Sequence, residues 1–319
     1  MEDFIKSMLN NTENKDSIDN TEDQEMSDLS VFDKEREQRK KTFNGLSAKE
    51  WTLLSRSVWS DVSSIRKEKH LSHGATYPEK LCDRTIKMYS NKGDLILDPF
   101  LGTGTTSIAA IKIGRNSVGI ELTDHFFKIA KCEIDRALEE SRVLLNSDII
   151  EAKTIHGDCT TIIDELQDNS IQLTLTSPPY ANLIHIVEDD RKNRHKSSAF
   201  VVENNATTKK YSDDNNDLGN MSLEQYTIAV ERIMRSIFKK TKKDGYCVWV
   251  VKDYRDMKNN VPYVDLHSII ASTGVKAGFK YHDLIIWDQN EQRKLVLLGY
   301  PSRFYVNQNH SYLVVLRKW

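Results

Sequence analysis

The stretch Leu95-Ile-Leu-Asp-Pro-Phe-Leu-Gly-Thr-Gly-Thr-Thr106 decides the fold. Its first three residues are apolar and predict a short strand, which a loop containing Gly102 and Gly104 joins to a predicted helix over 107–113. In open α/β sheets such a loop lies at the carboxyl end of the strand, where ligands bind. The two glycines permit a tight turn and a close approach of the backbone to a ligand.

Outward from this stretch, strands and helices alternate along the chain. We predict strands over 95–97, 117–122, 154–156, 171–176, 246–251, 283–287 and 312–316. We predict helices over 47–58, 78–89, 107–113, 124–145, 223–240 and 267–277. Because the strands are almost uniformly apolar, both faces of the sheet are expected to be covered by helices. The prediction is an α/β fold with a seven-stranded, mainly parallel sheet that ends in an antiparallel hairpin.

Charge divides the chain of 319 residues into two parts. The total net charge is −2, but residues 1–30 contain nine acidic and only two basic side chains. The rest of the chain is therefore modestly positive, and the near-neutral total does not exclude a nucleic-acid partner. We predict a disordered acidic tail over 1–30, an N-terminal extension over 31–76 and the α/β domain over 77–319.

Further composition features indicate a cytoplasmic protein. No apolar run approaches the length that spans a bilayer, and the N-terminus does not resemble a secretion signal. The four cysteines are widely spaced without a Cys-x-x-Cys pair, which argues against a zinc knuckle or a disulfide framework. We expect no metal.

Two acidic residues follow the strands that come after the glycine loop. Glu121 ends the second predicted strand, where an acid can bind both hydroxyls of a ribose. Asp158 follows the third strand, where an acid can meet an adenine amino group. For each residue, capping of the next segment is an alternative role. The loop itself lacks the Gly-Lys-Ser/Thr of nucleoside-triphosphate loops and the third glycine of the dinucleotide fingerprint.

The fourth predicted strand ends in Thr176-Ser-Pro-Pro-Tyr180. Pro178 and Pro179 cannot continue a strand, and they set the chain direction just beyond the sheet. The Ser177 hydroxyl, the neighbouring carbonyls and the Tyr180 ring are thereby held in one arrangement. A plain strand-ending turn is the alternative interpretation.

Together, Asp98–Thr106 and Ser177–Tyr180 resemble the cofactor and catalytic motifs of the DNA amino-methyltransferases, which make N4-methylcytosine or N6-methyladenine. The segments 73–81, 245–251 and 309–318 also resemble segments of this family, so the likeness covers about residues 70–319. The resemblance implies a Rossmann-like class I methyltransferase fold, S-adenosyl-L-methionine as cofactor and double-stranded DNA as partner. The cofactor-binding residues that it implies are His73, Ala75, Thr76, Pro78, Asp98, Phe100, Gly102, Gly104, Thr105, Glu121 and Asp158.

The catalytic residues implied by the resemblance are Ser177, Pro178, Pro179 and Tyr180. The target base is expected to leave the duplex and stack on Tyr180. Ser177 and the Pro178 carbonyl are expected to accept hydrogen bonds from its exocyclic amine, whose nitrogen then attacks the sulfonium methyl without a covalent enzyme intermediate. Ser177 favours cytosine N4 over adenine N6, because the cytosine-N4 members commonly carry Ser at this motif position.

Several questions stay open at this level. The regions 181–220 and 288–309 are candidates for target recognition, and a restriction endonuclease partner or a solitary enzyme are both compatible with the motifs. The alternatives are an RNA or protein-glutamine methyltransferase, a non-catalytic nucleic-acid-binding module on the same fold, and a nicotinamide-dependent oxidoreductase. The last leaves Ser-Pro-Pro-Tyr unexplained.

Overall fold

A computed structural model describes residues 42–62, 77–145, 150–180, 217–256, 259–293, 295 and 302–319. The chain divides into two compact units, Met1–Ser47 and Ala48–Trp319. In the first unit only a short turn is described, in which the Gly45 N–H donates to the Thr42 carbonyl and the Leu46 N–H to Asn44 Oδ1. The predicted acidic tail over 1–30 lies outside the described residues.

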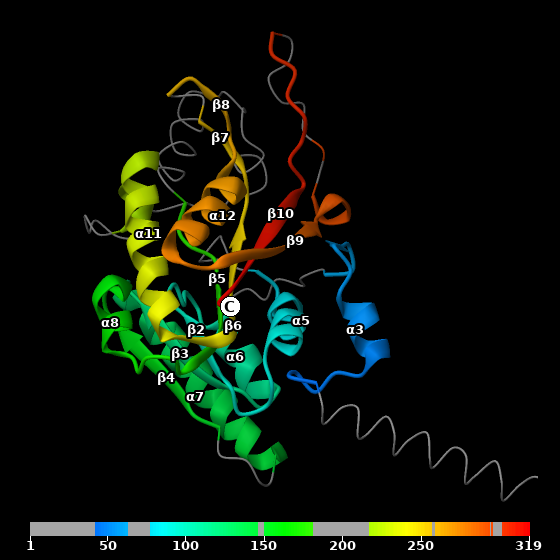
Figure 1. The fold of residues 1–319 in the computed structure, drawn as a ribbon, viewed down its shortest axis with the longest axis vertical. Helices are drawn as coiled ribbons and strands as arrows, with labels where there is room; N and C mark the ends of the chain where they lie inside the picture. Colours follow the sequence, from blue (N-terminus) through cyan, green and yellow to red (C-terminus); the bar gives the residue numbers. More distant parts are fainter. Residues whose placement is uncertain are drawn as a thin grey trace, which may run out of the picture. The chain divides into compact units, whose positions relative to one another are not determined.

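The second unit contains an eight-stranded sheet (Figure 1). Its strands are β1 (Val58–Trp59), β2 (Leu95–Asp98), β3 (Asn116–Glu121), β4 (Ala152–His156), β5 (Ile171–Thr176), β6 (Thr241–Val251), β9 (Lys280–Asp288) and β10 (His310–Arg317), in the order β1-β9-β10-β6-β5-β2-β3-β4. All pairings are parallel except those of β10 with β6 and β9. The chain order reverses between β2 and β5, which creates the crevice where open sheets of this type bind ligands.

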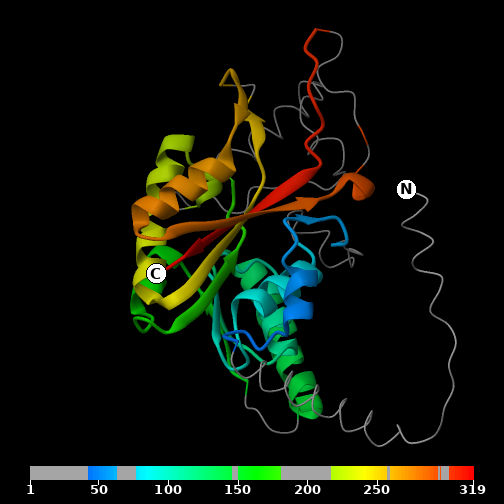
Figure 2. The same cartoon turned by 45° about the vertical axis from the view of Figure 1, so that its right-hand side comes forward.

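Helices cover both faces of this sheet (Figure 2). The helices are α3 (Ala48–Leu54), α5 (Glu79–Tyr89), α6 (Thr105–Lys112), α7 (Asp124–Leu145), α8 (Cys159–Glu165), α11 (Leu223–Lys240) and α12 (Leu266–Ala277), with short 3-10 turns at Leu218–Asn220 and Asn290–Gln292. One core cluster joins α8, α11 and α12 to the sheet, and another joins α5 and α6 to its other side. The predicted α/β class with a parallel sheet and a final antiparallel pair is confirmed. None of the helices in the described residues is long and apolar enough to cross a membrane.

Three strands and one helix were not predicted from the sequence. The sheet has an eighth strand, β1, and β7 (Tyr254–Asp256) pairs with β8 (Val261–Val264) as a separate two-stranded sheet. Helix α8 directly follows Asp158. Each of these elements has seven residues or fewer, which is too short to display a period that distinguishes strand from helix.

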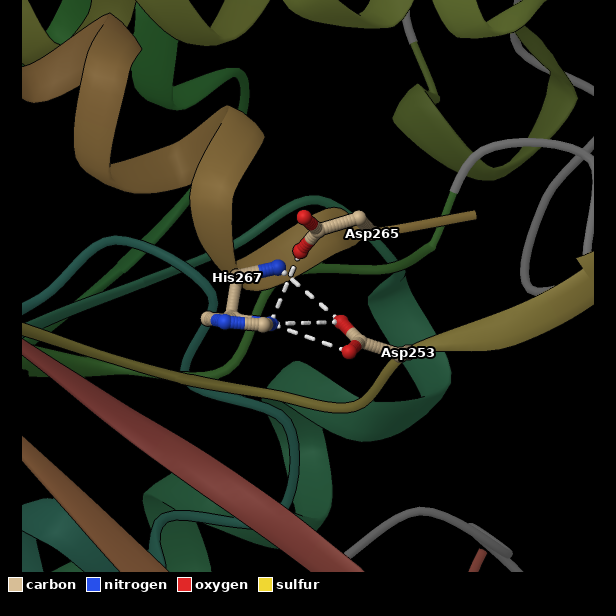
Figure 3. A group of neighbouring side chains, drawn as sticks. All are labelled: Asp253, Asp265 and His267. Carbon is tan, nitrogen blue, oxygen red and sulfur yellow. Dashed lines mark hydrogen bonds and ion pairs between the residues drawn. The ribbon is translucent and has the colours of Figure 1, made fainter. Parts of the chain in front are cut away.

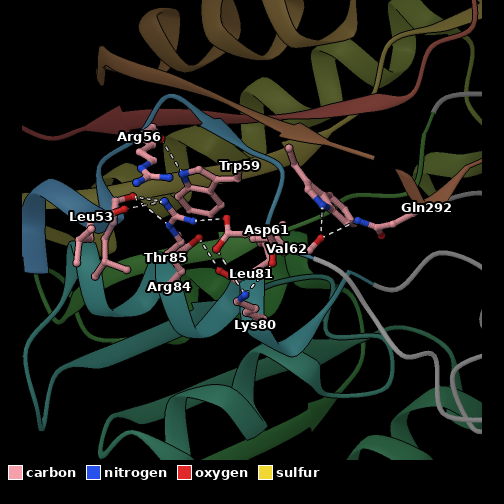
Figure 4. Close-up of polar contacts among 12 residues, drawn as sticks. Leu53, Arg56, Trp59, Asp61, Val62, Lys80, Leu81, Arg84, Thr85 and Gln292 are labelled. Carbon is pink, nitrogen blue, oxygen red and sulfur yellow. Dashed lines mark hydrogen bonds and ion pairs between the residues drawn. The ribbon is translucent and has the colours of Figure 1, made fainter. Parts of the chain in front are cut away.

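The predicted helix over 47–58 ends four residues early, at Leu54, because Arg84 of α5 binds its last turn (Figure 4). The Arg84 guanidinium donates to the carbonyls of Leu53 and Leu54 and to Asp61 Oδ1, and it lies 4.1 Å above the Trp59 ring. A cation at the C-terminal carbonyls of a helix stabilises its end. The chain then runs extended as β1 along β9, so residues 48–62, which we placed in an N-terminal extension, belong to the unit that contains the sheet.

Candidate functional site

Asp98 joins the glycine loop to the strand that carries the Ser-Pro-Pro-Tyr motif. Its side chain is 2% exposed, and Oδ1 accepts hydrogen bonds from Thr176 Oγ1 at 2.6 Å and the Phe100 N–H at 3.1 Å. Oδ2 accepts from Thr106 Oγ1 at 2.6 Å and the Tyr77 hydroxyl at 3.2 Å. Burial raises the Asp98 pKa, and the bonds from Thr106 and Thr176 partly offset that rise. The carboxylate therefore positions both motifs, and its direct contact with a cofactor stays a prediction.

The two glycines of the loop adopt the left-handed conformation that their position requires. Gly102 has φ +56° and Gly104 has φ +92°, and Gly104 caps the N-terminus of α6. A Cβ on Gly104 would approach Ile134 of α7 to 3.2 Å. Thr105 begins α6, whose first N–H groups have no partner within the helix and point toward the loop side. The sequence prediction of a tight turn before a helix is confirmed at these positions.

Glu121 stands at the end of β3 with one backbone donor on each carboxylate oxygen. Oε2 accepts the Gly102 N–H and Oε1 accepts the Thr123 N–H, both at 2.8 Å. Burial raises the Glu121 pKa, and these two N–H groups oppose the rise. An ionised carboxylate offers about four acceptor positions, so acceptor capacity remains beside the two N–H groups and the Thr123 side chain. This remaining acceptor capacity suits the hydroxyl groups of a ribose.

Asp158 caps the N-terminus of α8, which is the alternative role that the sequence allowed for it. Its Oδ1 accepts the Thr160 N–H at 2.8 Å. The preceding Gly157 has φ +146°, and a Cβ there would lie 2.9 Å from Ile162. The cap uses one carboxylate oxygen, so a contact between Asp158 and an adenine amino group stays a prediction.

The Ser-Pro-Pro-Tyr motif leaves the sheet directly after β5 and is packed from two sides. The Tyr180 ring lies parallel to that of Tyr254, with 10° between the planes and 6.5 Å between the centroids. Burial raises the Tyr180 pKa to about 12, against hydrogen bonds from the Ser177 hydroxyl and the Lys252 backbone that lower it. Pro179 lies close to Gly219, where an added Cβ would meet it at 3.6 Å. A serine hydroxyl has two lone pairs, so the Ser177 oxygen can act as an acceptor at the end of β5.

A cluster beside Tyr254 contains potential metal-ligating groups (Figure 3). Asp253, Asp265 and His267 each offer one ligand atom, and these atoms lie within 4.8 Å of one another. His267 Nδ1 lies 2.9 Å from an oxygen of each carboxylate, and Asp253 Oδ2 also accepts from the Tyr263 hydroxyl at 2.9 Å. These internal hydrogen bonds account for the cluster, which ties the end of β6 to the start of α12.

The remaining predicted residues are placed as follows. His73, Ala75 and Thr76 lie outside the described residues. Of the candidate recognition regions 181–220 and 288–309, residues 181–216, 294 and 296–301 also lie outside them, and the recognition role of both regions stays a prediction. Pro78 precedes α5 as its N-cap residue, and Phe100 packs edge-on against Trp249 with 6.0 Å between the ring centroids. Their cofactor contacts stay predictions.

Sequence reasoning did not select Tyr77, Thr106 or Thr176 as site residues, although all three bind Asp98. It also missed Tyr254 and the Asp253–His267 pair. Thr106 and Thr176 stand within the two quoted motifs, so a polar side chain next to each loop was an available signal. For Tyr254 and Asp253 the sequence contains no comparable pattern.

The chain is similar to known DNA methylases over part of its length. The family model described as DNA methylase (N6_N4_Mtase) matches residues 6–132. The type II methyltransferase M.MthZI of Methanothermobacter thermautotrophicus is 43% identical over 94 residues, which are 28% of this chain and 26% of that protein. The DNA adenine methyltransferase YhdJ of Escherichia coli is 37% identical over 83 residues, 25% of this chain and 28% of that protein. The matched segment thus spans about a quarter of these relatives.

A solved structure from Thermus thermophilus, in complex with S-adenosyl-L-methionine, is 20% identical with a TM-score of 0.34 and covers 51% of this chain and 53% of its own.

Proposed function

Because this chain belongs to the family of DNA N4/N6 methylases, we propose that it transfers a methyl group from S-adenosyl-L-methionine to the exocyclic amine of a base in double-stranded DNA. The observation that carries the proposal is the link from Asp98 to Thr176 at 2.6 Å, since it joins the loop of a cofactor site to the motif of a base site. Neither motif alone requires such a link. A reaction between two bound molecules requires that both sites be held in register.

The cofactor would be held by the glycine loop and the two acids that follow it. Glu121 accepts the ribose hydroxyls on the free positions of its carboxylate, and Asp158 meets the adenine amino group. Phe100 borders the cofactor near the reacting methyl, and residues 73–78 cover its methionine end. S-adenosyl-L-methionine supplies an electrophilic methyl group on a sulfonium ion.

The base site acts by orienting the target base and its exocyclic amine. Tyr180 stacks on the flipped base, while the Ser177 oxygen and the Pro178 carbonyl accept hydrogen bonds from its amine. These acceptors draw the nitrogen toward tetrahedral geometry and free its lone pair from the ring.

We favour cytosine N4 as the acceptor because the motif begins with Ser177, and adenine N6 is the second candidate, with YhdJ as an adenine methyltransferase among the relatives. The two bases are distinguished by expressing the chain in a host that lacks DNA methylation. Mass spectrometry of the hydrolysed host DNA then identifies the product, and single-molecule sequencing gives the recognition motif. A folded chain that leaves the host DNA unmodified would overturn the proposed function.

The site assignment is tested with Ser177→Ala and Tyr180→Ala. Both variants should bind S-adenosyl-L-methionine as the wild type does, because neither residue belongs to the cofactor loop. Methyl transfer should fall by at least about 100-fold in each, since positioning of the amine is lost. Near-normal methylation by both variants would contradict the assignment of the base site.

A further inference from the structure

The carboxylate of Asp253 lies just beyond the end of β6 and accepts three donors. His267 Nδ1 lies 3.0 Å from Oδ1 and 2.9 Å from Oδ2, and the His267 backbone N–H donates to Oδ1 at 3.1 Å. The Tyr263 hydroxyl donates to Oδ2 at 2.9 Å. Asp253 is only 2% exposed, so these donors take the place of water around the carboxylate. Two of the three belong to one residue in the first turn of α12 (Figure 3).

The His267 ring is fixed by a second set of contacts. It stacks on Tyr312 of β10, with 4.0 Å between the ring centroids and 19° between the planes. The Tyr312 hydroxyl in turn shares a 2.8 Å hydrogen bond with His310 Nε2. Asp265, the N-cap residue of α12, places Oδ1 2.9 Å from His267 Nδ1. Because Nδ1 faces carboxylate oxygens, it carries a proton and acts as the donor to Asp253.

The two neighbours of Asp253 lie against Tyr180 of the base site. Tyr254 stacks on the Tyr180 ring, with 10° between the planes and 6.5 Å between the centroids, and Tyr180 packs on the core cluster that contains Tyr254. A hydrogen bond from the Lys252 backbone opposes the rise that burial causes in the Tyr180 pKa. Since each residue has only two soft backbone dihedrals, anchoring the Asp253 side chain restricts the positions of both neighbours.

We propose that Asp253 and His267 are positioning residues for the target base, because they fix the Tyr254 ring that supports Tyr180. This inference rests on the proposed function and extends it to what holds the base site. The two prolines of the motif have no N–H groups, so they cannot donate hydrogen bonds that would tie Tyr180 to the sheet. Support from the side therefore matters, since a misplacement of about 1 Å can lower a rate about 100-fold.

The test compares two substitutions at His267 that differ in the donor. His267→Leu removes Nδ1, whereas His267→Asn places an amide nitrogen near the position of Nδ1. Under single-turnover conditions and saturating S-adenosyl-L-methionine, His267→Leu should methylate a duplex with the recognition sequence about 10-fold to 100-fold more slowly than the wild type. His267→Asn should recover most of this loss. Both variants should bind S-adenosyl-L-methionine with the wild-type Kd, because the His267 side chain bonds to Asp253 and Asp265 and not to the glycine loop.

The matched control is His282→Leu. His282 also lies beside a carboxylate, with Nε2 3.5 Å from Asp283 Oδ2, and its ring also contacts a tyrosine, with 5.5 Å between its centroid and that of Tyr246. It stands near the start of β9, which runs in the same direction as β6 because both are antiparallel to β10. His282 is therefore at the opposite end of the strands from Asp253, and the same substitution should leave the methylation rate unchanged.

A second readout does not depend on methyl transfer. Incorporation of 3-fluorotyrosine gives each tyrosine a fluorine NMR signal, and Tyr180→Phe and Tyr254→Phe assign the signals of the two stacked rings. His267→Leu should shift both signals, His267→Asn should return them, and His282→Leu should leave them in place. A merely stabilising role of His267 would lower the unfolding temperature without moving the Tyr180 signal.

Tyr263→Phe provides a milder variant, should His267→Leu fail to fold. It removes another donor to Asp253 from a side chain that is 44% exposed. The methylation rate should fall and the Tyr180 signal should shift, in the same directions as for His267→Leu and by smaller amounts.

A wild-type methylation rate in His267→Leu, or equal losses in His267→Leu and His267→Asn, would overturn the inference while the proposed function stands. A Tyr180 signal that stays in place in His267→Leu would overturn it as well. A wild type that methylates no duplex would overturn the proposed function, and the fluorine signals would then still decide whether His267 positions the Tyr180 ring.

Discussion

Replacing Thr176 by valine should separate the glycine loop from the base site without changing the shape of the core. Thr176 is fully buried, and its hydroxyl makes a 2.6 Å hydrogen bond to Asp98 Oδ1. Valine keeps the volume and removes the hydroxyl. A hydrogen bond to a charged group contributes about 1.5–3 kcal/mol to stability, so we expect Thr176→Val to lower the free energy of unfolding by about 2 kcal/mol. For a unit of this size that corresponds to about 4–8 °C in Tm.

The same strand supplies the control. Thr174 is also fully buried, two residues earlier in β5, and its hydroxyl has no hydrogen-bond partner among the described residues. Thr174→Val should therefore change the free energy of unfolding by less than about 0.5 kcal/mol or increase it slightly. Both variants exchange a buried threonine hydroxyl for a methyl group. The difference between their free energies of unfolding therefore cancels the contribution of the added methyl group.

The assay is urea-induced unfolding of the whole chain, followed by calorimetric titration with S-adenosyl-L-methionine. Thr176→Val should weaken cofactor binding because Asp98 also holds the Phe100 N–H and Thr106 of the glycine loop. A double-mutant cycle with Asp98→Ala should give a coupling of about 1.5–3 kcal/mol between the two residues. Equal free energies of unfolding for Thr176→Val and Thr174→Val would refute this reasoning.

Two further outcomes follow from single positions. Gly104→Ala should lower both stability and cofactor affinity, because φ is +92° and the new Cβ meets Ile134 at 3.2 Å. Gly93→Ala, with φ +78° and open space around it, should cost only about 1–2 kcal/mol in unfolding free energy and leave cofactor affinity unchanged. If both variants bind the cofactor equally, the loop geometry is not what holds it. The hydrogen bond from Lys240 lowers the Asp168 pKa. The pair therefore stabilises the fold at pH values above the ordinary pKa range of carboxyl groups, and this stabilisation is lost as the pH falls through the lowered pKa. Urea unfolding should show Asp168→Asn less stable than the wild type at neutral pH and equal to it at about pH 2, and a constant difference would contradict this.

The sheet could be predicted from the sequence because its signals are local. An apolar run such as 95–97, followed by glycines or prolines, contains both the strand and its end within ten residues. Since the carboxyl ends of parallel strands meet at one edge, the same local signals placed Glu121 and Ser177 near the glycine loop. Short elements could not be predicted. Strand β1 has two residues, and its place beside β9 depends on Arg84 and Trp59, which come together only in the folded chain.

The sequence by itself determined the fold class and which loops meet at the site, since apolar strand runs and turn chemistry act between neighbours in the chain. Only the tertiary structure decided how the site is held and what lies around Tyr180. Asp98 binds Tyr77 and Thr176, which are 21 and 78 residues away, and Tyr254 reaches Tyr180 from an element that does not follow it directly. Such contacts leave no period in the sequence, because hydrogen bonds and ring contacts between distant segments depend on packing that the whole chain determines at once.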